Sequence, residues 1–339
     1  MNAPNDTRPV IAMAMGDPAG ISPELTAKLV ALDEARAAAH LVVIGDARVF
    51  AAGAATAGVK ADFTTIGAND PVPAARERPV FVDLRHLDPA AIVRGKPSRE
   101  GGAFALANYR HALERVKRGE ARAVCFTPFN KQAMRLADDS YDDEIGFTAG
   151  VLGVTSPATE FNILEGLWNA RVTSHVPMAE VPKLLTVDGI VGALEITAEA
   201  LRAAGYNPPR IAVAALNPHA GDGGNFGREE IDVIAPAVAK AKAKGIPCDG
   251  PYPADTVFVR AKRGDYDAVM TMYHDQGQIA MKLMGFDRGV TLLGGFPFPI
   301  CTPAHGTAYD IAGKGVANLG ATRAAVLLAA QMARRADRA

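Results

Sequence analysis

Short apolar runs alternate with alanine-rich runs of helical length along most of this chain. The runs that read as strands are Pro9–Met15, Leu41–Ile44, Pro79–Leu84, Ala123–Phe126, Ile211–Leu216 and Ala268–Met272. The helical runs are Pro23–Leu32, Arg48–Gly58, Gly102–Arg118 and Glu229–Lys244, with an amphipathic one at Ala321–Ala339. Strands that alternate with helices form parallel sheets with crossover helices. We therefore predict an α/β fold.

The composition narrows the class of protein. A length of 339 residues suits two domains or one two-lobed unit, and 49% hydrophobic residues can supply a large core. The net charge is −1 without a basic stripe, so we expect no nucleic-acid partner. No apolar run is long enough to span a bilayer, and Met1–Asp6 lacks the features of a signal peptide. The cysteines Cys125, Cys248 and Cys301 form no CxxC, which favours a reducing compartment, so we expect a cytoplasmic protein.

Three histidines lie in separate cassettes rich in Gly, Pro, Asn and Asp. They are His175 in Thr173–Pro177, His219 in Asn217–Gly221 and His274 in Met272–Gly277. Each follows a strand-like run, of which Val151–Leu164 is the loosest. A histidine just past a strand end in an α/β protein lies at the rim where ligands bind. One such histidine needs no function, but three together indicate a site for one divalent cation, because imidazole suits Zn, Co, Ni or Mn and an open three-histidine site admits substrate.

Two glycine-rich cassettes are candidates for holding a nucleotide. In Met15–Glu24, the glycines allow a tight turn, Ser22 can cap a helix and Pro23 fits its first position. This cassette is not GxGxxG, so the usual dinucleotide fingerprint is missing, and a plain strand-to-helix turn explains it equally well. The second cassette, His305–Asn318, supplies backbone N–H groups, a hydroxyl, a lysine and an asparagine, which are the groups that phosphate and ribose require.

Together these cassettes resemble the 4-hydroxythreonine-4-phosphate dehydrogenase family of vitamin B6 biosynthesis. The resemblance runs from about Ile11 to Ala325. Its strongest parts are Gly16–Gly20, Asn217–Gly221, Asp249–Pro251, Pro253–Thr256, Tyr273–Gly277 and His305–Ala308. That family is itself similar to the isocitrate and isopropylmalate dehydrogenases, and His305–Asn318 resembles their cofactor-adenosine loop.

The resemblance implies a homodimer of two-lobed α/β/α subunits of the isocitrate/isopropylmalate dehydrogenase type. The active site would lie in the cleft between the lobes and be completed by the neighbouring subunit. Residues 1–127 with 284–339 would form the cofactor-side lobe, and residues 128–283 the metal, substrate and dimerisation lobe. The implied cofactors are NAD, with NADP as the alternative, and one divalent cation per site (Zn, Co, Mn or Mg).

The resemblance also assigns site residues position by position. The metal ligands are His175, His219 and His274. The catalytic residues are Lys282, Asp255 and Lys131, and Lys282 would also contact an anionic group of the substrate. Thr148 would bind the substrate, and Asp255 or Asp275 would orient a histidine or water. The cofactor residues are Gly16, His305, Gly306, Thr307, Ala308 and Asn318. Taken singly, Lys282 also fits a solvated surface lysine, and both aspartates fit helix caps or turns.

Three substrate positions depart from the family's pattern. Phe147 stands where the family has histidine, Thr291 where it has asparagine, and Ile300 where it has arginine. A guanidinium clamps a carboxylate or phosphate with two hydrogen bonds, which isoleucine cannot do. We therefore expect the metal and cofactor machinery of the family with a changed, more apolar substrate pocket.

The implied reaction oxidises a secondary hydroxyl of a small phosphorylated hydroxy acid, with decarboxylation of the resulting 3-keto acid. Candidate substrates are 4-hydroxythreonine-4-phosphate and 4-phospho-threonate or erythronate. A cis-dihydrodiol carboxylate from aromatic degradation is an alternative substrate. A metal-dependent hydrolase is an alternative of another class, because histidines and aspartates also suit activated water, although it leaves His305–Ala308 unexplained. A non-enzymatic small-molecule binding protein is the third.

Overall fold

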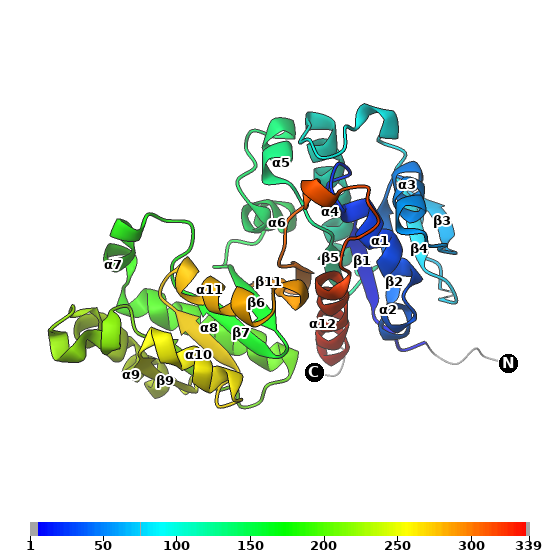
Figure 1. Cartoon of the computed structure of the whole chain (residues 1–339). Helices are drawn as coiled ribbons and strands as arrows, with labels where there is room; N and C mark the ends of the chain where they lie inside the picture. The colour runs from blue at the N-terminus through cyan, green and yellow to red at the C-terminus, as the bar shows by residue number, and fades with distance from the viewer. Residues whose placement is uncertain (1–5, 75, 337–339) are drawn as a thin grey trace. The chain divides into compact units, whose positions relative to one another are not determined.

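The computed structural model describes residues 6–74 and 76–336, which divide into two compact units (Figure 1). The described residues up to Ser156, with those from Phe296 onward, form unit 1, and Pro157–Gly295 forms unit 2. Both expected boundaries lie elsewhere, because residues 128–156 belong to unit 1 and residues 284–295 to unit 2. The reason is packing: α6 (Glu144–Leu152) contacts α4 (Arg99–Lys117), and β11 (Val290–Gly294) pairs with β6 (Thr159–Leu164).

Unit 1 contains a parallel sheet with the strand order β3-β4-β2-β1-β5-β12. The strands are β1 (Val10–Ala14), β2 (His40–Gly45), β3 (Thr64–Gly67), β4 (Val80–Asp83), β5 (Ala123–Phe126) and β12 (Ile300–Pro303). The other helices are α1 (Ser22–Ala31), α2 (Asp33–Ala38), α3 (Ala47–Ala57), α5 (Lys131–Ala137) and α12 (Gly320–Ala336). Every residue of β1, β2 and β5 is buried, as expected of strands covered on both faces. The predicted α/β class is confirmed.

Local signals explain where several helices of unit 1 begin and end. The Asp46 side chain accepts from the Arg48 N–H at the start of α3, which ends at Gly58 with φ 65°. Ser98 caps α4 in the same way. Ser22 does not cap α1, because its hydroxyl donates to the Pro128 carbonyl 2.7 Å away. Residues 337–339, predicted to end the last helix, lie outside the described part of the chain.

Unit 2 contains a mixed sheet with the strand order β11-β6-β7-β10-β8-β9. Its remaining strands are β7 (Leu167–Arg171), β8 (Ile211–Ala214), β9 (Cys248–Tyr252) and β10 (Ala268–Thr271). Its helices are α7 (Val181–Leu184), α8 (Val187–Ala204), α9 (Ala235–Ala243), α10 (Ala254–Lys262) and α11 (His274–Gly285). A hairpin joins β6 to β7 through Glu165 and Gly166, which both have positive φ as its turn requires.

One expectation for the strands was wrong. The strand before His175 is β7, whereas Val151–Leu164 completes α6 and then forms β6. In β7 the chain lacks the continuous apolar pattern by which the predicted strands were recognised.

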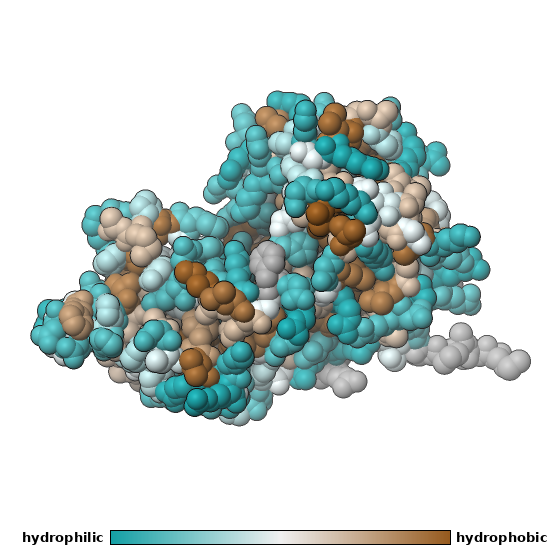
Figure 2. All heavy atoms as spheres, viewed as in Figure 1, coloured by the Kyte–Doolittle hydropathy of each residue, from teal (hydrophilic) through white to brown (hydrophobic). Residues whose placement is uncertain are grey.

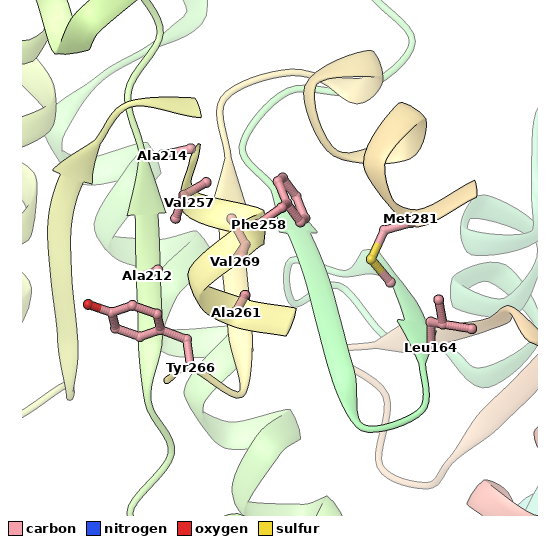
Figure 3. Packing of buried hydrophobic residues seen from close by; sticks show 9 residues of the cluster. All are labelled: Leu164, Ala212, Ala214, Val257, Phe258, Ala261, Tyr266, Val269 and Met281. Carbon is pink, nitrogen blue, oxygen red and sulfur yellow. The ribbon is translucent and has the colours of Figure 1, made fainter. Parts of the chain in front are cut away.

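One apolar cluster fixes α10 and α11 on the sheet of unit 2. Figure 3 shows Val257 and Phe258 of α10 beside strands β8 and β10, and Met281 of α11 near Leu164. These side chains are at most 7% exposed. The cluster matters for function because the first turns of the two helices carry Asp255 and His274. No helix in the described part of the chain has the length and apolarity that a membrane crossing requires.

A glycine contact between α4 and α5 provides a test of the packing in unit 1. A Cβ atom at Gly102 would lie 1.9 Å from the Ala133 carbonyl oxygen, whereas one at Gly192 in α8 would meet nothing within 4 Å. We predict that Gly102→Ala lowers the free energy of unfolding by about 1–3 kcal/mol, measured in urea, because the helices must separate. Gly192→Ala should raise it by about 0.5–1 kcal/mol. Equal effects of the two substitutions would contradict the close contact.

Candidate functional site

The three predicted metal histidines follow three neighbouring strands of unit 2. Strand β10 pairs in parallel with both β7 and β8. His175 follows β7, His219 follows β8, and His274 begins α11 directly after β10. Because the carboxyl ends of parallel strands meet at one edge of a sheet, the three cassettes emerge on the same edge of unit 2.

His175 and His274 lie side by side. Their ring centroids are 5.6 Å apart. His274 Nδ1 lies 2.6 Å from an Asp275 carboxylate oxygen. A carboxylate only accepts, so this contact places the proton on Nδ1 and leaves Nε2 as the ligand atom. Of the two aspartates predicted to orient a histidine or water, Asp275 is the one in contact with His274.

The His219 loop has an unusual backbone. His219, Ala220 and Asp222 have φ between 45° and 54°, in the left-handed region that side chains other than glycine rarely adopt. Glu230, 3% exposed, holds the start of this loop. One of its carboxylate oxygens accepts from the Leu216 and Asn217 N–H groups at 2.8 and 2.7 Å, and the other accepts from the Asn217 side chain at 2.9 Å.

The residues fit part of a metal site. Imidazole nitrogen suits the divalent cations expected here, and His175 and His274 present two rings together. Within residues 6–74 and 76–336, no group of three His, Cys, Asp or Glu side chains could hold one ion, so His219 does not join the pair. One chain, as far as it is described, brings together two of the three predicted ligands.

Gln276 connects two of these strand ends, and the sequence did not single it out for this role. Its side-chain oxygen accepts from the Met272 N–H at 2.7 Å, and its NH₂ group donates to the Ala215 carbonyl at 2.6 Å. Ala215 follows β8 and Met272 follows β10, so one amide ties the approaches to the His219 and His274 cassettes. Gln276 could have been suspected from the sequence because it lies within the Tyr273–Gly277 motif. Nothing in the sequence pointed to Glu230.

A polar network lies inside unit 2, between the histidine pair and Thr291. Arg171, 5% exposed, donates to Ser174 beside His175, to Asn162 and to Glu160. Asn162 in turn donates to the Thr291 hydroxyl. Burial lowers the pKa of Arg171, and the neighbouring Glu160 carboxylate opposes this shift. Apart from Thr291, these residues were not recognised from the sequence, because Arg171 and Asn162 lie in strands that were not predicted cleanly.

Two predicted catalytic residues lie on exposed helix turns of unit 2. Lys282 lies on α11 two turns after His274, and Asp255 lies in the first turn of α10. A contact of either side chain with the histidine pair therefore stays a prediction.

The two glycine-rich cassettes of unit 1 pack against each other. The Ile21 N–H donates to the Thr307 carbonyl at 3.0 Å, and the Tyr309 hydroxyl donates to Asp17. Asp17 is 1% exposed; burial raises its pKa, while the hydrogen bonds from Tyr309 and the Ala19 N–H lower it. The cassettes meet because β1, β5 and β12 are neighbouring parallel strands.

The predicted cofactor residues differ in what they are able to do. A Cβ at Gly16 would lie 2.2 Å from the Thr127 carbonyl oxygen, so this glycine is required for backbone packing. Gly306 is exposed and has open space around its Cα. Thr307 is 8% exposed, His305 is half-buried, and Ala308 has φ 43°. Asn318 accepts from the Gly320 N–H at 2.7 Å and so helps to begin α12.

The predicted substrate residues of unit 1 are largely inside it. Thr148 is fully buried, with its hydroxyl 2.6 Å from both the Tyr109 hydroxyl and the Glu144 carbonyl oxygen. Ile300 is also fully buried. Phe147 stacks on Tyr109 and lies under the Arg110 guanidinium, 4.9 Å from the ring centroid. Lys131 lies 3.3 Å from the Glu144 carboxylate.

Comparison with known proteins shows that the chain resembles one family over most of its length. A family model described as "Pyridoxal phosphate biosynthetic protein PdxA" matches residues 37–329. The chain is 60% identical over 330 residues to a Rhizobium meliloti (strain 1021) protein provisionally named 4-hydroxythreonine-4-phosphate dehydrogenase 2, covering 97% of this chain and 95% of the relative. It is 37% identical over 328 residues to a provisionally named D-threonate 4-phosphate dehydrogenase of Symbiobacterium thermophilum, covering 97% and 98%. A crystal structure of 4-hydroxythreonine-4-phosphate dehydrogenase from Klebsiella pneumoniae matches with a TM-score of 0.85 at 35% identity, over 98% of this chain and 100% of that one.

The Glu230 contacts predict how the His219 loop is held. In Glu230→Gln an NH₂ group would replace one acceptor oxygen and face donors, so we expect the free energy of unfolding to fall by about 1–3 kcal/mol in urea. Hydrogen exchange at residues 217–224 should become faster. Glu229→Gln is the matched control, because Glu229 accepts from Asn217 alone among these groups. Unchanged exchange in Glu230→Gln would show that this carboxylate does not hold the loop.

Proposed function

The chain belongs to the family of pyridoxal phosphate biosynthetic protein PdxA and is an oxidoreductase that acts on a phosphorylated hydroxy acid, and on this premise we propose a metal-dependent, NAD-linked reaction. The substrate would be a 4-phospho-threonate, a 4-phospho-erythronate or 4-hydroxythreonine-4-phosphate, with decarboxylation of the 3-keto acid formed. The observation that carries the proposal is the His175–His274 pair with Asp275 at the carboxyl edge of parallel strands. NADP is the alternative cofactor.

The histidine pair would hold the divalent cation. A bound cation of this kind lowers the pKa of a hydroxyl and stabilises the negative charge that develops on its oxygen. The protein's own contribution is orientation, because Asp275 fixes the tautomer of His274, and Gln276 ties the His274 cassette to the end of β8.

The packed glycine cassettes of unit 1 would bind the nicotinamide cofactor. A bound nicotinamide accepts the hydride that leaves the carbinol carbon. Gly306 is exposed and has open space beside its Cα, and Thr307 is fixed by its carbonyl contact with Ile21. Gly16 would act through packing rather than through contact with the cofactor.

We also propose that a homodimer completes the metal site. Two observations support it. His219 does not join the histidine pair within the described part of one chain, so in a three-histidine site the His219 imidazole would come from the neighbouring copy of the chain. Figure 2 shows hydrophobic side chains over α11, where Ile279 and Leu283 are 60% and 85% exposed on the helix that His274 begins. An exposed apolar surface of this kind favours association.

The proposed reaction can be tested by the absorbance of reduced nicotinamide. The panel contains 4-phospho-D-threonate, 4-phospho-D-erythronate, 4-hydroxythreonine-4-phosphate and a cis-dihydrodiol carboxylate, each with NAD or NADP. We predict turnover of a phosphorylated acid that a chelator abolishes and Zn, Co or Mn restores. Turnover of the dihydrodiol would favour the alternative substrate, and hydrolysis without nicotinamide the hydrolase. Full activity after the chelator has removed the metal would contradict the metal requirement.

Removing one imidazole tests the ligand set. His219→Ala should abolish metal-dependent reduction of NAD and lower the bound metal content, while circular dichroism shows an unchanged fold. His86→Ala is a suitable control, because this histidine stacks on Phe104 in unit 1 and belongs to no predicted site. Full activity and metal content in His219→Ala would refute the three-histidine site.

A further inference from the structure

Asn162 occupies a central place in the polar network of unit 2. It lies on β6 directly opposite Thr291 of β11 and is 7% exposed. Its side-chain oxygen accepts from Arg171 Nη1 at 2.6 Å and also from the Gln278 NH₂ group. Its own NH₂ group lies 3.3 Å from the Thr291 hydroxyl.

The orientation of this amide follows from chemistry. Arginine has only donors, so the Asn162 atom that faces Arg171 must be the oxygen. The nitrogen is then forced toward Thr291. Arg171 itself is held in place, because its other nitrogens donate to Glu160 at 2.6 Å and to Ser174 at 3.1 Å. The buried guanidinium therefore sets which way Asn162 points.

The orientation of the Asn162 amide determines how the Thr291 hydroxyl can form hydrogen bonds. A threonine hydroxyl has one proton to donate and two lone pairs to accept with. Because Asn162 donates to it, this hydroxyl acts as an acceptor toward the protein and keeps its proton for another partner. Among the described residues no acceptor of that proton is found. Thr291 is half-buried, so a bound molecule can reach it.

The position of the network supports a contact with the substrate. Ser174, which accepts from Arg171, precedes His175. Gln278 lies on α11 one turn after His274 and one turn before Lys282, so these three residues follow one side of the helix. Through Asn162, Thr291 is therefore connected by hydrogen bonds to the segments that carry the predicted metal and substrate residues.

We propose that Arg171 and Asn162 are positioning residues that fix the Thr291 hydroxyl as a hydrogen-bond donor to an acceptor oxygen of the substrate. This inference rests on the proposed function and narrows its substrate class. The group at Thr291 must present an acceptor, such as a carboxylate, phosphoryl, carbonyl or hydroxyl oxygen, and cannot be an ammonium group, which only donates. The donor to this oxygen, the Thr291 hydroxyl, is uncharged. Ile300 cannot supply a charged donor.

Asn162→Asp gives the sharpest test, because it replaces the NH₂ group by an oxygen of similar size. The carboxylate would accept the hydrogen bond that the Thr291 hydroxyl donates. That hydrogen bond is then no longer available to the substrate. We expect the KM for 4-phospho-D-threonate, or the best acid of the panel, to rise about tenfold or more, with kcat changed little. Thr291→Val should raise KM similarly, and the double variant should show no further rise, because both changes remove one interaction.

Two controls separate this effect from charge and from general damage. Asn162→Asp adds a negative charge, and Glu160→Gln in the same chain removes one, so the double variant restores the charge of the network and should retain the raised KM. Thr64→Val makes the same side-chain change in β3 of unit 1 and should leave KM unchanged. A KM in Asn162→Asp equal to the wild-type value, or fully additive effects with Thr291→Val, would overturn the inference.

A measurement without substrate keeps the two proposals distinguishable. The ¹⁵N signal of the Asn162 side-chain amide, assigned by its loss in Asn162→Asp, should shift in Thr291→Val and in Arg171→Met. An unchanged signal in both variants would show that the hydrogen bonds do not exist. A wild-type protein that oxidises no acid of the panel contradicts the proposed function, and with it the substrate contact. Turnover with an unchanged KM in Asn162→Asp refutes the inference about Thr291 alone.

Discussion

Parallel pairing of strands is the constraint on which both candidate sites depend. In unit 2, β10 lies between β7 and β8, and all three run in the same direction. In unit 1, β5 lies between β1 and β12 in the same way. Each set of three strands therefore delivers three loops to one edge, although the loops are far apart in the sequence. The loops carry the predicted site residues, and backbone hydrogen bonds between the strands determine which loops come together.

The sheet of unit 2 buries several polar side chains, among them Asn162, Asn169 and Arg171. Asn169 of β7 is fully buried and donates to the carbonyls of Ala170 and Val269 and to the Thr271 hydroxyl. Gly277 of α11 is needed above it, because a Cβ there would lie 2.2 Å from the Asn169 side-chain oxygen. The Asn169 nitrogen is paired in this way, while its oxygen has no hydrogen-bond partner among the described residues. The close approach of Gly277 to Asn169 thus determines how the helix that begins with His274 sits on the sheet.

The same polarity explains what the sequence could and could not predict. Strands β1, β5, β8 and β10 were recognised because each is an unbroken apolar run buried on both faces. Strand β7 was missed because Asn169 and Arg171 interrupt that pattern. The adjacency of His175 and His274 followed from their motifs and their places after strands. The contact of Glu230 with Asn217 could not be predicted, because it depends on how a left-handed loop folds back on a later turn.

The buried Arg171 does not take the place of the arginine that the family has where this chain has Ile300. Ile300 in unit 1 is fully buried and apolar, so it cannot clamp an anion. Arg171 in unit 2 supplies a buried guanidinium, but the Glu160 carboxylate 2.6 Å away already neutralises it. Breaking such a buried pair to bind a substrate anion would leave Glu160 uncompensated, at a cost of about 3–5 kcal/mol. Arg171 is therefore poorly suited to act as a substitute clamp. Its guanidinium instead orients the Asn162 side chain, through the hydrogen bond from Nη1 to the Asn162 oxygen.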